Sequence, residues 1–114
     1  MTDRIRKRAA MEDFRIIYRI LKFLNESMDY DEFDSEAFTA DRFGTNDNRF
    51  RALLIQLQKD GYIEGLEIVR YIRQKPMIKP PMCPVITLKG LEYLNENSMM
   101  KKAAKMAKGI IDTI

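Results

Sequence analysis

Residues 46–94 decide the fold, and they read NDNRFRALLIQLQKDGYIEGLEIVRYIRQKPMIKPPMCPVITLKGLEYL. An amphipathic pattern predicts a helix that ends near Asp60, with Gly61 suited to the position that follows a helix. A β-prone run, a proline-rich loop and a second short β run come next, and a further helix follows. This order predicts an α+β winged helix-turn-helix fold, in which a three-helix core carries a β-hairpin wing and extra C-terminal helices.

The helix after Gly44 is the expected recognition helix, capped by Thr45 or Asn46. Its apolar residues recur at helical spacing and predict a core stripe, and at 100° per residue the opposite side faces outward. In this fold the outward side enters a DNA major groove. The core stripe is Phe50, Leu53, Leu54 and Leu57, and the outward side is Asn48, Ala52, Ile55 and Lys59, flanked by Arg51 on one side and by Arg49 and Gln56 on the other.

The preceding pattern predicts a first helix from about Ala9 to Ser27, with two apolar stripes. Two stripes are more apolar surface than a helix covered on one side needs. Either the helix is packed on two sides within the monomer, or part of its surface is an intermolecular face. The first stripe is Phe14, Ile17, Leu21 and Leu24, and the second is Ile16, Ile20 and Phe23.

An acidic linker follows the first helix, and Ser35 can cap a short second helix through about Asp41. Gly44 then suits a tight connection with a positive φ. Four carboxylates within residues 29–34 invite comparison with an EF-hand, which needs glycine at its sixth position and glutamate at its twelfth. Those positions hold Asp34 and Ala40, so we expect a solvated loop and no metal site.

The wing is expected to begin with Tyr62 and Ile63 and to continue with a strand over residues 66–72. Residues 74–84 hold four prolines, which predicts an unpaired wing tip. A strand then resumes at residues 85–86. Thr87 can cap a helix from Leu88 to about Asn97, and Ser98 can cap a last amphipathic helix within residues 99–114.

Composition predicts a single domain over residues 1–114, with a basic, flexible N-terminus at residues 1–8. No apolar run approaches the ~20 residues of a membrane span. Cys83 is the one cysteine, which is typical of a cytoplasmic protein. The chain has no histidine and no glycine motif that cradles phosphate. We therefore expect no enzyme activity, no cofactor and no metal.

The net charge of +3 is unevenly distributed along the chain. Residues 23–47 carry one basic side chain, Arg42, against eight acidic ones, whereas residues 48–89 carry eight basic side chains against three acidic ones. The chain is therefore polarised and not generally basic, which limits where a nucleic acid could bind.

Three stretches of the chain carry a family resemblance. They are KDGYIEG at residues 59–65, ITLKGLEYL at residues 86–94 and NSMMKKA at residues 97–103, of which the last is the most specific. With these residues the chain resembles the YjcQ family of small bacterial and phage winged-helix proteins. The resemblance implies the winged-helix fold and assigns neither an activity nor site residues.

The leading hypothesis is a protein that binds double-stranded DNA and acts as a small regulator of transcription. Lys and Arg side chains on the wing would contact phosphates or an adjacent minor groove. The recognition helix would contact the edges of the nucleobases. Two features oppose DNA binding, namely Asp47 close to a docked backbone and Ile55 on the groove side. The candidate DNA-binding residues are Asn48, Arg49, Arg51, Gln56, Lys59, Arg70, Arg73, Lys75 and Lys79.

The alternative is a protein-interaction module that does not bind DNA. Its support is the second apolar stripe of the first helix, Ile55 on the outward side of the recognition helix, the aliphatic and methionine side chains of the wing loop, and the methionine-rich final helix. A homodimer through the C-terminal helix and the first helix is one form of this hypothesis, and another protein partner is the second. Membrane binding is not expected, because the final helix has shallow apolar bulk and no aromatic anchor.

Overall fold

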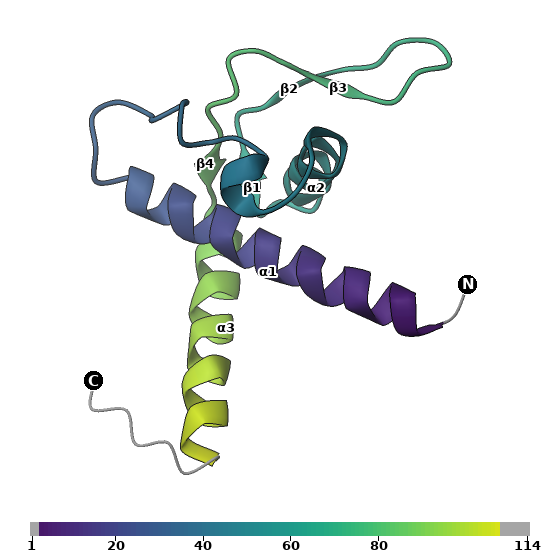
Figure 1. Cartoon of the computed structure of the whole chain (residues 1–114). Coiled ribbons are helices and arrows are strands. Elements are labelled where there is room, and N and C mark those ends of the chain that lie inside the picture. The colour runs from purple at the N-terminus through teal and green to yellow at the C-terminus, as the bar shows by residue number, and fades with distance from the viewer. Residues whose placement is uncertain (1–2, 108–114) are drawn as a thin grey trace.

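The computed structural model describes the backbone of residues 3–107 and the side chains of residues 12–97. The described chain is α+β, and its arrangement is compatible with a winged helix (Figure 1). The helical elements are α1 (Asp3–Ser27), the 3₁₀ helix η1 (Asp41–Phe43), α2 (Asp47–Lys59) and α3 (Leu88–Ala107). The strands are β1 (Ile63–Glu64), β2 (Glu67–Val69), β3 (Met77–Lys79) and β4 (Val85–Ile86).

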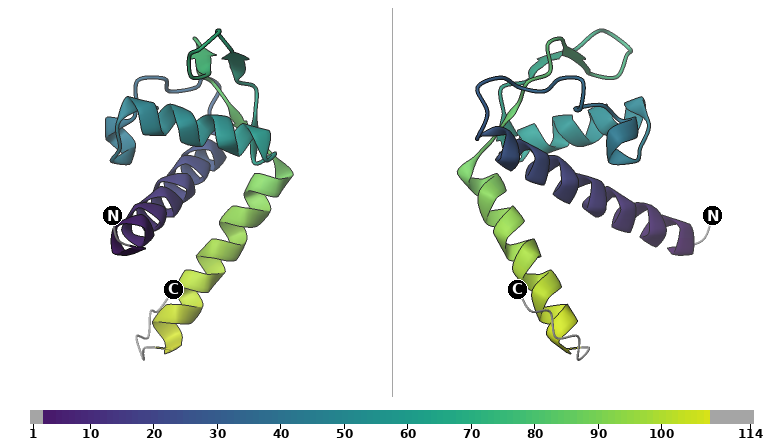
Figure 2. Two further views of the ribbon diagram at one scale, coloured as in Figure 1. Left: turned by 90° about the vertical axis from the view of Figure 1, so that its right-hand side faces the viewer. Right: turned by 60° about the vertical axis from the view of Figure 1, so that its left-hand side comes forward.

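The four strands form two separate antiparallel pairs. β1 pairs with β4, with Ile63 opposite Ile86, and β2 pairs with β3, with Ile68 opposite Ile78. The views of Figures 1 and 2 place α2 between α1 and the β2–β3 hairpin, while α3 runs away from the body beneath them. The β1–β4 pair therefore joins the end of α2 to the start of α3.

The core is built on α1. Ile20 and Leu21 are fully buried, and both apolar stripes of the helix contribute to the core, which confirms that it is covered on two sides within one chain. Its packing partners include η1 in one direction and α3 with β4 in the other. Phe14 is the exception, because its side chain is 60% exposed although the pattern places it in the core stripe.

The turn and cap residues of α2 agree with the sequence. Gly44 has φ of 77° in the left-handed region, and the Asn46 side chain accepts the Arg49 backbone N–H at 2.9 Å. Gly61 follows the helix with φ of 86°. At the start of α3, the Thr87 hydroxyl oxygen accepts the Gly90 backbone N–H at 3.1 Å, which confirms this cap.

The ends of the long helices differ from the prediction. α1 begins at Asp3 and not at Ala9, so the helix includes residues 3–8. α3 runs without interruption to Ala107, so Ser98 begins no separate helix. Both extensions are free of proline, and nothing in them stops helix propagation. Residues 108–114 of the predicted last helix lie outside the described residues.

The predicted second helix over residues 35–41 is wrong, because turns and the short η1 occupy this segment. The Asp34 carboxylate accepts the Ala37 backbone N–H at 3.2 Å, which closes a side-chain turn in competition with a helix. Phe33 and Phe38 both pack on the ring of Phe23 in α1, with centroids 5.8 and 5.5 Å from it. Aromatic burial therefore determines the path of the acidic linker.

The predicted bounds of the wing strands are also wrong. Residues 77–79 form β3 inside the proline-rich loop that was expected to be unpaired, whereas Tyr71 and Ile72 lie beyond the end of β2. The strand fits between Pro76 and Pro80 because its own three residues retain their N–H groups. Ile78 at its centre is buried against the core, which holds the strand in place.

Candidate nucleic-acid interface

The hairpin tip, residues 70–76, joins β2 to β3 and projects beyond α2 (Figure 1). Its base is anchored to α2, because the Gln58 side chain donates to the Leu66 carbonyl at 2.9 Å and accepts the Leu66 N–H at 2.7 Å. At the tip, the Gln74 N–H donates to the Tyr71 carbonyl at 3.3 Å, and Arg73 has φ of 62°. The tip is thus an ordered turn on a fixed support.

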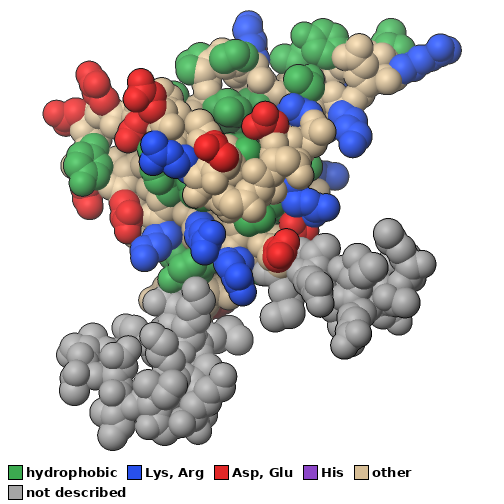
Figure 3. Space-filling model, viewed as in Figure 1, with side chains coloured by type: hydrophobic (Ala, Val, Ile, Leu, Met, Phe, Trp, Pro, Cys, Tyr) green, Lys and Arg blue, Asp and Glu red, His purple; other side chains and the backbone are tan. Residues whose placement is uncertain are grey.

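The charge of the tip is positive and unopposed. Arg70, Arg73 and Lys75 are exposed, and no ion pair joins any of them to another described residue. No acidic residue occurs in the sequence between Glu67 and Glu92. Figure 3 shows Lys and Arg side chains at this far end of the molecule, and acidic side chains gathered at the opposite end.

Lys79, the fourth basic candidate residue on the wing, differs from the other three because it has an acidic partner. Its Nζ lies 3.8 Å from a carboxylate oxygen of Glu67, and both side chains are exposed. An exposed pair at this distance contributes little and breaks easily. Lys79 can therefore turn toward a phosphate, but it must first leave Glu67, whereas the basic side chains of the tip have no acidic partner to leave.

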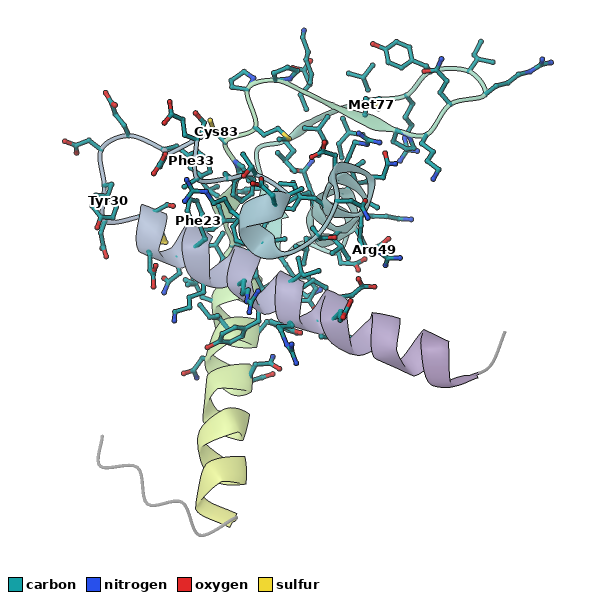
Figure 4. All side chains as sticks on the ribbon, in the orientation of Figure 1. Phe23, Tyr30, Phe33, Arg49, Met77 and Cys83 are labelled. Carbon is teal, nitrogen blue, oxygen red and sulfur yellow. The ribbon has the colours of Figure 1, made fainter. Side chains whose placement is uncertain are left out.

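The candidates on α2 are largely paired with one another or with acids. Arg49 donates to both carboxylate oxygens of Asp13 in α1, at 2.9 and 3.0 Å, and Figure 4 shows it between the two helices. Arg49 is exposed, as predicted, but in this structure it is held by an ion pair to α1. Arg51 donates to Asn48 at 2.8 Å, Gln56 donates to Asp60 at 3.0 Å, and Lys59 is exposed.

The N-terminus of α2 is surrounded by carboxylates. Glu12, Asp13 and Asp41 line a hollow that also includes Arg49. The Thr39 hydroxyl donates to Asp41 at 2.8 Å and holds the pKa of this carboxyl below its usual range. A phosphate at this end of α2 would meet like charge. The wing tip lacks this opposing charge, because no acidic residue lies between Glu67 and Glu92 in the sequence.

Ile55 on α2 is half-buried and packs against the core. The sequence placed it on the outward side, where it counted as evidence for a protein interface. Because its side chain is partly covered by the core of its own chain, this residue no longer favours a protein partner over DNA.

An apolar groove that sequence reasoning missed lies where α1, α2 and α3 meet. It encloses about 260 Å³, and the exposed Phe14 is part of its lining. Tyr62 and Tyr93 close one side with ring centroids 5.5 Å apart, and burial raises the pKa of Tyr93, with a further contribution from Tyr62. The sequence signal for this groove is the first apolar stripe of α1, whose residues Phe14, Ile17 and Leu21 line it.

Two features are absent from the part of the chain that the structure describes. No group of three or more acidic or cysteine side chains there is placed to hold a metal ion. None of the described helices is both long and apolar enough to cross a membrane.

Comparison with known proteins places most of the chain in one family model. The family model described as YjcQ protein matches residues 18–113, which include every candidate DNA-binding residue. No curated protein and no solved structure matches the chain.

Proposed function

The chain belongs to the YjcQ family, and within that family we propose that it is a winged-helix protein that binds duplex DNA and acts as a small regulator of transcription. The observation that carries the proposal is the anchored wing tip with Arg70, Arg73 and Lys75. These three basic side chains are exposed and have no acidic partner among the described residues. We infer that the protein acts by binding and not by catalysis.

In this proposal the wing supplies phosphate contacts, and α2 supplies base contacts. Asn48, Arg51 and Gln56 have side chains able to donate to base edges in a major groove. Their present bonds are short-range and exposed, so they exchange for contacts with DNA at small cost. Arg49 is bound to Asp13 and contributes only if that ion pair opens.

The test is binding of the full chain to random-sequence duplex DNA over a salt series. Five phosphate contacts, made by the three basic side chains of the tip together with Arg51 and Lys59, predict a slope of about −4.5 for log affinity against log salt concentration. Fluorescence anisotropy of a labelled duplex measures it. Affinity that does not change with salt, or no binding at low salt, would contradict the proposal.

A second candidate function is self-association through the apolar groove at Phe14. The observation that favours it is the 60% exposure of this ring in a groove lined by Ile17, Leu53 and Leu57. Apolar surface of this kind marks interaction sites. The partner we propose is a second copy that packs its own α1 or α3 into the groove.

Under this second candidate, Phe14→Glu is expected to convert a dimer into a monomer, because a carboxylate cannot be buried in the interface without a partner. Sedimentation velocity measures the state, and circular dichroism verifies that the variant remains folded. A wild-type protein that is already monomeric at the highest soluble concentration would contradict the candidate.

A further inference from the structure

Ile72 is an aliphatic side chain presented at the hairpin tip. It is 90% exposed, more than any other large hydrophobic residue among the described ones, and Tyr71 beside it is 56% exposed. Single exposed apolar residues are common on proteins. This one is distinctive because it stands at the end of a projecting hairpin, with Arg70 and Arg73 on either side of the two residues.

The support beneath Ile72 is fixed. The β2–β3 pairs and the buried Ile78 hold the hairpin against α2, and the turn hydrogen bond from Gln74 to Tyr71 closes the tip. The backbone of such a tip loses little further conformational freedom on binding. Its contact with a partner is therefore directed and not incidental.

The chemistry of the tip matches one kind of site. Aliphatic side chains act as wedges between base steps when a protein binds the minor groove, where they partly unstack the bases and kink the duplex. The minor groove is about 6 Å wide and too narrow for a helix, whereas a turn that ends in one side chain can enter it. Positive side chains on both sides of the wedge favour the strongly negative groove.

We propose that Ile72 inserts into the minor groove as a wedge at a flexible base step, while Arg70, Arg73 and Lys75 hold the flanking phosphates. This inference rests on the proposed DNA binding and adds a site preference to it. Pyrimidine–purine steps such as TA unstack most easily. The protein therefore bends its DNA and favours sites that contain such a step beneath the wing.

The test uses duplexes that carry 2-aminopurine next to a TA step, because the fluorescence of this base rises when it is unstacked. The wild-type chain is expected to bind and to raise the fluorescence. Ile72→Ala is expected to bind with the same salt slope and to lose the fluorescence rise. Leu88→Ala, which removes a 79% exposed aliphatic side chain at the start of α3, is the matched control and is expected to behave as the wild type.

The outcomes separate the wedge from the proposed function. Salt-dependent binding without a fluorescence rise, or an equal rise with Ile72→Ala, overturns the wedge and leaves DNA binding in place. No binding to any duplex overturns both. Binding to anionic phospholipid vesicles that Ile72→Ala abolishes, without any unstacking of DNA, would assign the tip to a lipid surface and overturn the wedge.

Discussion

Replacing Arg70, Arg73 and Lys75 together with alanine is expected to lower the affinity for duplex DNA by about three orders of magnitude at about 50 mM salt. Each phosphate contact contributes about 0.9 to the salt slope, so the slope should become shallower by about 2.7. The fold should not change, because the three side chains are exposed and make no ion pair with a described residue. The salt series measures both quantities in one experiment.

The matched control removes the same charge from α1. Arg15, Arg19 and Lys22 are exposed on one side of this helix, and α2 lies between α1 and the hairpin (Figure 1). Their replacement by alanine is expected to change affinity only through net charge, an effect that salt screens. An equal loss from both triple variants would show that DNA responds to net charge and would remove the wing as the site.

Local patterns in the sequence predicted the order of elements around α2. Asn46 and Thr87 are short polar residues that satisfy free backbone groups at helix starts, and both do so in the structure. Gly44 and Gly61 lie where the chain needs a positive φ. These features depend on neighbours within a few residues, which is why the sequence alone contains them.

Contacts between distant residues could not be predicted in the same way. The strand at residues 77–79 exists because Ile78 is buried against the core, a contact that outweighs the prolines around it. Phe14 fits the helical period of the core stripe, yet the divergence of α1 and α3 leaves its ring exposed. Periodicity gives the side of a helix on which a residue lies and not how far along the helix the covering elements extend.

The same distinction applies to the candidate site. The basic residues of the wing were predicted from the composition of that segment, and their lack of acidic neighbours is a local property of the sequence. The ion pair of Arg49 with Asp13 joins residues that are 36 positions apart, and no local pattern in the sequence predicts it. Electrostatic partners across the fold therefore decide which candidate residues are already engaged and which are free to contact a ligand.

The aromatic cluster beneath the acidic linker has Phe38 at its centre. This ring is 2% exposed, and its centroid lies 5.2–5.6 Å from those of four other phenylalanines. Figure 4 shows how α1 and the linker bring Phe23 and Phe33 together in this region. The four neighbours of Phe38 are Phe23, Phe33, Phe43 and Phe50.

Phe38→Ala is expected to lower the free energy of unfolding by about 3–5 kcal/mol, because it leaves a cavity among rings that cannot collapse into it. The free energy of unfolding of a small domain is only about 5–15 kcal/mol in total. The midpoint of thermal unfolding should therefore fall by about 15–30 °C. Urea denaturation followed by far-ultraviolet circular dichroism measures the change.

Phe14→Ala is the matched control for Phe38→Ala, because it removes the same ring from a 60% exposed position. A loss of about 1 kcal/mol or less is expected there. Equal losses at the two positions would contradict the placement of the aromatic cluster in the core. The linker would then lack the anchor that keeps its carboxylates at the end of the molecule opposite the wing, and the separation of charge on which the proposed DNA interface depends would have no structural basis.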